Sequence, residues 1–327
     1  MSRRAAALTG ALSLLGAGCT PLRDRRADTT GQSGGGIGGT GVMADAGPGV
    51  FGTITALGSI YVNGLHIELP AGLVTSGLLD GTAAPLTVGQ SVAVATARSG
   101  DALHARKVVE ILPLVGPVEG VDLLQRRITV MGTPVRLERR TALLDRTGEV
   151  ALPLAAIVPG DWLAVSGLWR EGAVIASRIE RLSARATARA TGLLRVDGGA
   201  VRIGGTAISD ANRAAPGFAA VSGAYRDGRL VAERIVTGAD ELFPAELDRL
   251  IVEAFLARNP DDPGYHLSGF GIPMNPASTV PATVGQRSIF VGRYDGSFLI
   301  ERSFAVPEDA TIRQGFLERI GTARLLE

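Results

Sequence analysis

The sequence has little cysteine, little histidine and few aromatic residues. Cys19 is the single cysteine of 327 residues, so the chain cannot form an internal disulfide. Aromatic residues make up 5% and histidines number 3, which leaves few of the side chains that metal centres and base-stacking surfaces use. The formal net charge of +1 gives no global attraction to polyanions, so we expect no nucleic-acid partner.

Glycine and small aliphatic residues are abundant instead. The chain contains 44 glycines and is 46% hydrophobic, which is enough for a packed core. Many glycines between short Val, Ile and Leu clusters favour short strands and turns over long helices. The length suits two or three domains.

Residues 1–19 have the layout of a secretory signal peptide. Arg3 and Arg4 form a basic region, Ala5–Leu15 is apolar, and three small residues then precede Cys19. The apolar run is too short for an ordinary membrane-spanning helix. We therefore predict export.

Cys19 resembles the lipidated cysteine of bacterial lipoproteins, although Gly16 stands where such signals usually have leucine. This favours a lipid anchor to the membrane through Cys19 and a periplasm-facing, outer-membrane location. A plain cleaved signal peptide is the alternative. Residues 20–49, with the glycine-rich stretch Gly34–Gly41, are predicted to be a flexible linker because they contain too little apolar surface to fold.

A hairpin pattern recurs four times after the linker. An opening glycine is followed by alternating apolar residues, a short turn that contains glycine, and an apolar strand that ends near a basic residue. The copies span residues 88–108, 159–179, 216–235 and 284–302. We predict positive φ at the turn glycines Gly100, Gly172, Gly228 and Gly296.

A second pattern precedes the first three hairpins and adds shorter strands, as in Gly52–Ile54 and Ile60–Gly64. About five strands per copy suit a small barrel of the oligonucleotide/oligosaccharide-binding (OB) type. The sequence therefore predicts a mainly β protein of tandem OB-like barrel modules. Their predicted bounds are 50–113, 114–183 and 188–238, followed by a divergent fourth β module within 240–327.

Apolar residues at helical spacing predict a short helical insertion over Pro244–Arg258, before the last module. Asn259, Pro260 and Pro263 are expected to end it. A second short helix is predicted near Ala310–Ile320.

The segment Gly52–Gly64, the preceding Gly36–Gly41 and the later Val-Gly-x-x-Val-x-Val motif resemble the bacterial family called domain of unknown function 5666. The resemblance covers roughly Gly36 to Gly238 and is most specific in the first module. It implies an exported, often lipid-anchored protein with tandem barrel-like modules. The family supplies no catalytic residues to carry over.

No metal, cofactor or catalytic group is predicted. His66 and His104 fall in one module and could meet across a sheet, but no cysteine or carboxylate cluster accompanies them. The acidic residues Asp240, Glu241, Glu246, Asp261 and Asp262 fit no calcium-loop spacing.

His266 precedes Ser268-Gly269-Phe270-Gly271, which lacks the Gly-x-Ser-x-Gly order of a nucleophile elbow.

Four side chains are the predicted ligand-binding residues on an exposed barrel face: Tyr61, Trp169, Arg170 and Tyr225. The favoured function is a non-enzymatic envelope module that binds a polymer or protein partner. The alternative is an envelope enzyme with its site in residues 242–327. A cleft with converging polar groups near His266 would favour the enzyme.

Replacing Cys19 by serine tests the anchor. Cys19→Ser removes the thiol that would be acylated, so the protein should move from the membrane pellet to the soluble fraction after cell lysis. Fractionation with immunoblotting measures this. A variant that is processed normally and stays in the membrane pellet would contradict the prediction.

Overall fold

The computed structural model describes residues 45–79, 85–145, 147–182, 187–211, 214–244, 246–258, 264–280 and 283–326. The chain divides into two units, residues 1–41 and 42–327, and all described residues belong to the second. The predicted signal peptide, Cys19 and most of the predicted linker lie outside the described residues. None of the helices described is both long and apolar enough to cross a membrane.

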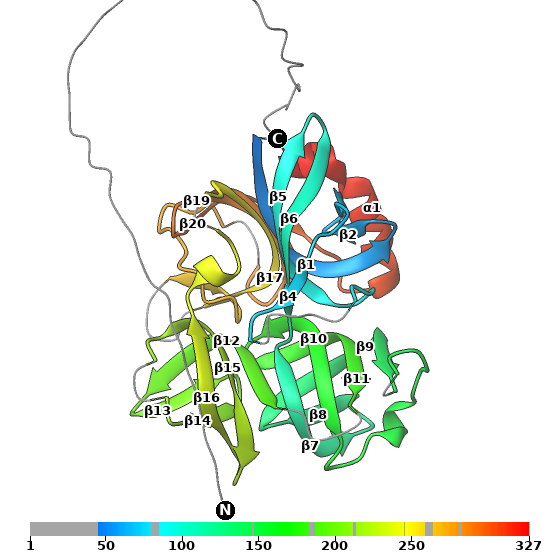
Figure 1. Cartoon of the computed structure of the whole chain (residues 1–327), viewed down its shortest axis with the longest axis vertical. Helices are drawn as coiled ribbons and strands as arrows, with labels where there is room; N and C mark the ends of the chain where they lie inside the picture. Colours follow the sequence, from blue (N-terminus) through cyan, green and yellow to red (C-terminus); the bar gives the residue numbers. More distant parts are fainter. Residues whose placement is uncertain are drawn as a thin grey trace, which may run out of the picture. The chain divides into compact units, whose positions relative to one another are not determined.

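The first barrel is a closed five-stranded sheet (Figure 1). Its order is β1-β2-β3-β6-β5, and β5 pairs with β1 again. Strands β3 and β6 run parallel, and the other neighbours in the ring are antiparallel. The bounds are β1 Asp45–Leu57, β2 Ile60–Val62, β3 Leu65–Glu68, β5 Ser91–Ser99 and β6 Ala102–Ile111, with the short β4 Thr75–Gly77 beside β6.

Two further barrels repeat this connectivity. The second closes as β7-β8-β9-β11-β10 and the third as β12-β13-β14-β16-β15. The bounds are β7 Leu114–Asp122, β8 Arg127–Val130, β9 Thr133–Leu144, β10 Trp162–Arg170, β11 Ala173–Arg181, β12 Ala188–Asp197, β13 Ala200–Ile203, β14 Thr206–Ser209, β15 Gly217–Arg226 and β16 Arg229–Thr237, with 3-10 turns at Leu154–Ala156 and Ala239–Glu241. The prediction of a mainly β chain of small barrels is confirmed.

The turn residues explain why the sequence folds into these hairpins. The two residues between β10 and β11, Glu171 and Gly172, have φ of 49° and 79°, the paired positive values of a type I′ turn. That turn matches the twist of its two strands. All four predicted turn glycines have positive φ, as expected: Gly100 58°, Gly172 79°, Gly228 72° and Gly296 97°.

The predicted helix over Pro244–Arg258 is wrong, because this segment contains strand β17, Arg249–Arg258. Its residues 250–257 are all buried. A run that is apolar except for Glu253 fits a helical period and a strand period equally well, and here it lies centrally between β1 and β19. The remaining elements are β18 Tyr265–Leu267, β19 Arg287–Tyr294, β20 Phe298–Ala305 and helix α1 Ala310–Leu326, which confirms the predicted C-terminal helix.

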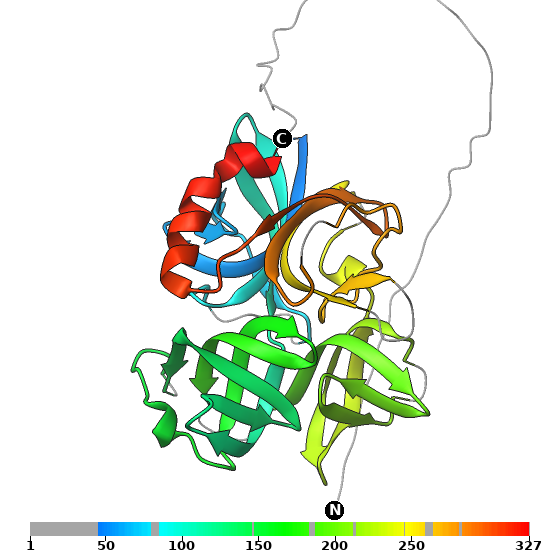
Figure 2. The same ribbon diagram turned by 180° about the vertical axis from the view of Figure 1, so that it is seen from behind.

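The C-terminal strands do not form a sheet of their own. Strand β17 runs parallel to β1, with Gly49 opposite Leu250 and Phe51 opposite Val252. The first barrel and the last strands therefore share one ten-stranded sheet. Figure 2 shows the first barrel and these strands from behind. Residues 45–49, predicted as linker, belong to β1, so that boundary is wrong. On the other side, β7 pairs with β12 and joins the second barrel to the third.

A buried ion pair lies where β17 meets β19. The Glu253 and Arg287 side chains are 1% and 7% exposed, and Arg287 Nε lies 2.8 Å from Glu253 Oε1. The backbone N–H of Thr53 on β1 lies 3.4 Å from Glu253 Oε2. Removing either charge would leave the other buried and uncompensated, which typically costs about 3–5 kcal/mol.

Glu110 is a carboxyl group at the junction of the barrels. Gln90 Nε2 donates to Glu110 Oε1 at 2.9 Å. Burial, and secondly the negative charge of Glu180 on β11, raise the pKa of Glu110 from 4.5 to about 7, and Arg189 on β12 opposes this. The folded protein therefore favours the protonated form of Glu110 more than the unfolded chain does.

This carboxyl group predicts a pH dependence of stability. Its contribution is fully present below pH 4.5 and is lost as pH rises to about 7, because ionisation is harder in the folded state. Glu110→Gln should therefore be more stable than wild type at pH 8, by about 1–3 kcal/mol, and nearly equal at pH 4. Chemical denaturation at both pH values measures this, with the exposed Glu149→Gln as control. Equal pH profiles for Glu110→Gln and wild type would contradict the assignment.

Candidate functional site

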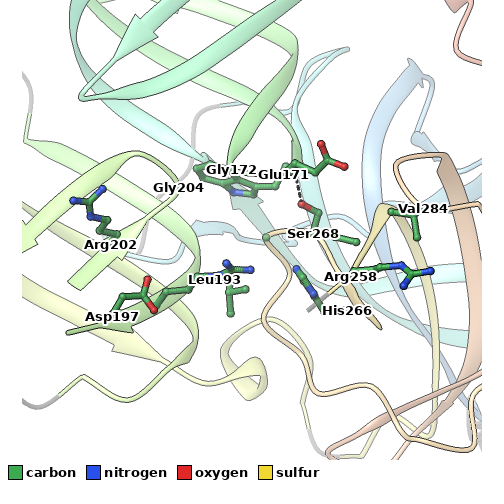
Figure 3. Close-up of a pocket in the computed structure, with 14 residues that line it drawn as sticks. Glu171, Gly172, Leu193, Asp197, Arg202, Gly204, Arg258, His266, Ser268 and Val284 are labelled. Atoms are coloured by element: carbon green, nitrogen blue, oxygen red, sulfur yellow. Dashed lines mark hydrogen bonds between the residues drawn. The ribbon is translucent and has the colours of Figure 1, made fainter. Parts of the chain in front are cut away.

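A cavity of about 510 Å³ lies between the second barrel, the third barrel and the C-terminal strands. Its walls come from the β10–β11 turn, the β12–β13 hairpin and the region of β17 and β18. Figure 3 shows Arg202 and Asp197 on one side, His266 and Arg258 on the other, and Glu171 with Ser268 between them. Because each wall belongs to a different part of the chain, packing of these parts creates the cavity.

Trp169 lines this cavity from the end of β10, and its side chain is only 8% exposed. Indole Nε1 donates to the Thr191 carbonyl at 2.9 Å. A Cβ added to Gly192, Gly204 or Gly269 would lie 2.7, 2.4 or 2.1 Å from an indole atom, closer than packing allows. The prediction of an exposed stacking indole is wrong, because three glycines from other elements enclose the ring.

The polar side chains on the walls are mostly basic. Arg195 on β12 and Arg202 on β13 stand opposite each other in the hairpin register, and both are exposed. Arg258 ends β17, and its guanidinium lies 5.8 Å from the centre of the Tyr265 ring. Asp197 and Glu171 are the acidic residues of the lining. Three guanidinium groups thus border the cavity with two carboxylates.

His266 and Ser268 lie on and just after β18, and both line the cavity. Burial, and secondly the positive charge of Arg195, lower the pKa of His266 below 6.5. The imidazole is therefore neutral at neutral pH. The Ser268 hydroxyl accepts a hydrogen bond from the Glu171 backbone N–H at 3.0 Å.

The other predicted ligand-binding residues lie elsewhere and are held by intramolecular contacts. Tyr61 stacks on His66 in the first barrel, with ring centres 4.8 Å apart. The Tyr225 hydroxyl donates to Glu119, and burial and this carboxylate raise the pKa of Tyr225.

Arg170 Nη1 lies 3.4 Å from Glu308 Oε1, and its guanidinium lies 5.2 Å from the Phe255 ring centre. Of the four predicted residues, only the neighbours Trp169 and Arg170 are brought together, and only Trp169 lines the 510 Å³ cavity.

The histidines of the first barrel have separate partners. His104 Nδ1 lies 3.2 Å from Glu68 Oε2, and His66 Nε2 lies 3.2 Å from the Gly58 carbonyl oxygen. Within the described residues, no three His, Cys, Asp or Glu side chains gather in a way that could hold a metal ion. Asp261 and Asp262 lie outside the described residues.

Sequence reasoning did not single out Arg195, Arg202 and Arg258 as a group. Arg195 and Arg202 lie three residues either side of the turn Gly198-Gly199, a symmetry that a two-residue hairpin requires of cross-strand partners. This symmetry about the turn could have predicted from the sequence that Arg195 and Arg202 are cross-strand partners. Nothing in the sequence indicated that Arg258 faces the same space.

Comparison with known proteins gives one match. Residues 115–180 match the family model described as Domain of unknown function (DUF5666). The match covers strands of the second barrel, and for this segment it is the family predicted from the sequence. The resemblance in the sequence was most specific in the first barrel. Searches of curated proteins and of solved structures found no match.

Replacing Trp169 tests how much its indole stabilises the junction between the second barrel, the third barrel and the C-terminal region. Trp169→Ala should lower the free energy of unfolding by about 3–5 kcal/mol, because it removes a buried ring and leaves the Thr191 carbonyl without its donor. Chemical denaturation followed by circular dichroism measures this. Trp169→Phe, which keeps an aromatic ring, should lose less. A change below about 1 kcal/mol in the alanine variant would show that the indole does not support the junction.

Proposed function

We propose that this protein, whose second barrel matches the family domain of unknown function 5666, is an exported, lipid-anchored envelope protein. In this proposal its barrels form a non-enzymatic binding module. Cys19 attaches it to the outer membrane, and the barrels face the periplasm. Their connectivity supports a relationship to OB-type barrels, which bind ligands through one face and its flanking loops.

The cavity beside Trp169 is the observation that carries the proposal. Its volume of about 510 Å³ falls in the range of small-molecule sites. Apolar side chains, among them Leu193 and Val284, share its lining with a few convergent polar groups. This mixture is typical of sites that hold a ligand by its apolar surface and orient it by its polar groups. The ligand is an envelope small molecule or the end of an envelope polymer or protein.

An envelope enzyme is the second candidate, because His266 lines the same cavity. A nucleophilic mechanism needs a base within hydrogen-bond reach of the nucleophile. Among the described residues, the Ser268 hydroxyl is bonded to the Glu171 backbone, and no hydrogen bond joins it to His266. Binding without chemistry is therefore the better-supported function.

Blocking the cavity tests the proposal without assuming what the ligand is. Val284 lines the cavity and is 37% exposed, so an indole at this position can fill the entrance without disturbing the buried core. Wild-type protein incubated with bacterial envelope extract should retain a compound that native mass spectrometry detects. Val284→Trp should retain at least about tenfold less, which corresponds to about 1.4 kcal/mol.

Val158→Trp is the matched control, because Val158 is 53% exposed and lies outside the lining. It should retain the compound as the wild type does. Equal retention by Val284→Trp and Val158→Trp would overturn the cavity as the binding site.

A further inference from the structure

The β12–β13 hairpin places two like charges directly opposite each other at the cavity. Arg195 and Arg202 are register partners, so their side chains leave the same face of the hairpin. Like charges in this arrangement destabilise a sheet. Both residues line the cavity, so the repulsion is concentrated at its wall.

Within the described residues, no acidic side chain lies within ion-pair distance of either arginine of this pair. In the part of the chain that the structure describes, neither Arg195 nor Arg202 forms an ion pair, although Asp197 follows Arg195 by two residues on the same strand. Another cross-strand arginine pair, Arg127–Arg136 on strands β8 and β9 of the second barrel, differs, because Asp122 Oδ2 lies 3.4 Å from Arg127 Nη2. The pair at the cavity has no carboxylate this close among the residues that the structure describes.

A third arginine lines the cavity from the other wall. Arg258 lines the cavity and contacts the Tyr265 ring without an ion pair among the described residues. The positive charge of Arg195 acts on the His266 imidazole of the other wall. An oxyanion at the Arg195–Arg202 pair would receive charge-assisted hydrogen bonds from guanidinium groups in a cavity whose other wall is also basic.

We propose that the ligand of this cavity is anionic, with a carboxylate or phosphate group held by Arg195 and Arg202 on one wall, while Arg258 adds positive charge on the other. This inference rests on the proposed function. The planar guanidinium fork binds both groups in bidentate geometry. Leu193 and Val284 then provide the apolar surface for the body of the ligand, which the volume limits to about the size of one or two sugar rings.

Three sugars of similar size can show whether the cavity binds a carboxylate or a phosphate. Isothermal titration calorimetry of the mature protein with glucuronate, glucose 6-phosphate and glucose compares a carboxylate, a phosphate and no charge. At least one of the two acids should bind, and binding should weaken as salt is added because the guanidinium groups are exposed. Whichever acid binds more tightly identifies the group that the site prefers.

Two double variants provide the matched comparison. Arg195→Gln with Arg202→Gln should weaken binding of the acid at least about tenfold, since two charge-assisted contacts are lost. Arg226→Gln with Arg229→Gln removes another exposed cross-strand pair, on the β15–β16 hairpin and outside the cavity lining, and should change binding by less than about twofold. Circular dichroism confirms that both variants fold.

Several results would overturn the inference. Glucose binding as tightly as the two acids would exclude recognition of charge while leaving the cavity as a ligand site. Equal weakening in both double variants would assign the effect to general surface charge. Absence of binding by both acids at millimolar concentration would also reject the inference. The proposed function is tested separately, because a cavity that binds nothing would give equal retention by Val284→Trp and Val158→Trp.

Discussion

The burial of Trp169 is the contact on which the arrangement of the barrels depends. The indole belongs to the second barrel, but the glycines that enclose it, Gly192, Gly204 and Gly269, belong to the third barrel and to the C-terminal region. Side chains at these positions would hold the neighbouring segments away from the ring. A single aromatic residue thus packs against three parts of the chain at once, which a large rigid ring can do at low entropy cost.

Strand pairing between the barrels and the C-terminal strands also fixes how these parts are arranged. Closing five strands into a barrel leaves few strand edges without a partner. Two strands also pair outside their own barrel: β1 pairs with β17, and β7 pairs with β12. The Glu253–Arg287 pair is buried beside the first of these junctions. Because a buried charge without its partner is costly, this pair penalises any other register of the C-terminal strands.

The cavity follows from these two constraints. Trp169 and Ser268 lie at its inner side, while the turns and strand ends that reach past the packed core carry the guanidinium groups. The third barrel alone would present the Arg195–Arg202 pair to solvent, and the C-terminal strands alone would present Arg258. Packing of these parts places all three guanidinium groups on one cavity. Their convergence gives the molecule its candidate chemistry, and His266, neutral at neutral pH, adds hydrogen-bonding capacity without further charge.

The local structure of this protein could be predicted from sequence to a large extent. Turn glycines such as Gly172 and Gly228 and the alternation around them predict the hairpins, because positive φ and period-2 burial are local properties. The repetition of that pattern predicts the barrels, and the spacing after Ala310 predicts the final helix.

Only the tertiary structure decided how these pieces combine. Residues 250–257 are apolar except for Glu253, so periodicity could not distinguish a buried strand from a helix. Pairing with β1 on one side and β19 on the other made the segment a strand. The exposure of Trp169 depended on glycines 23, 35 and 100 residues further along the chain. The Arg195–Arg202 pair follows from local hairpin register, but the presence of Arg258 on the same cavity depended on packing of the third barrel against the C-terminal strands, which no local pattern encodes.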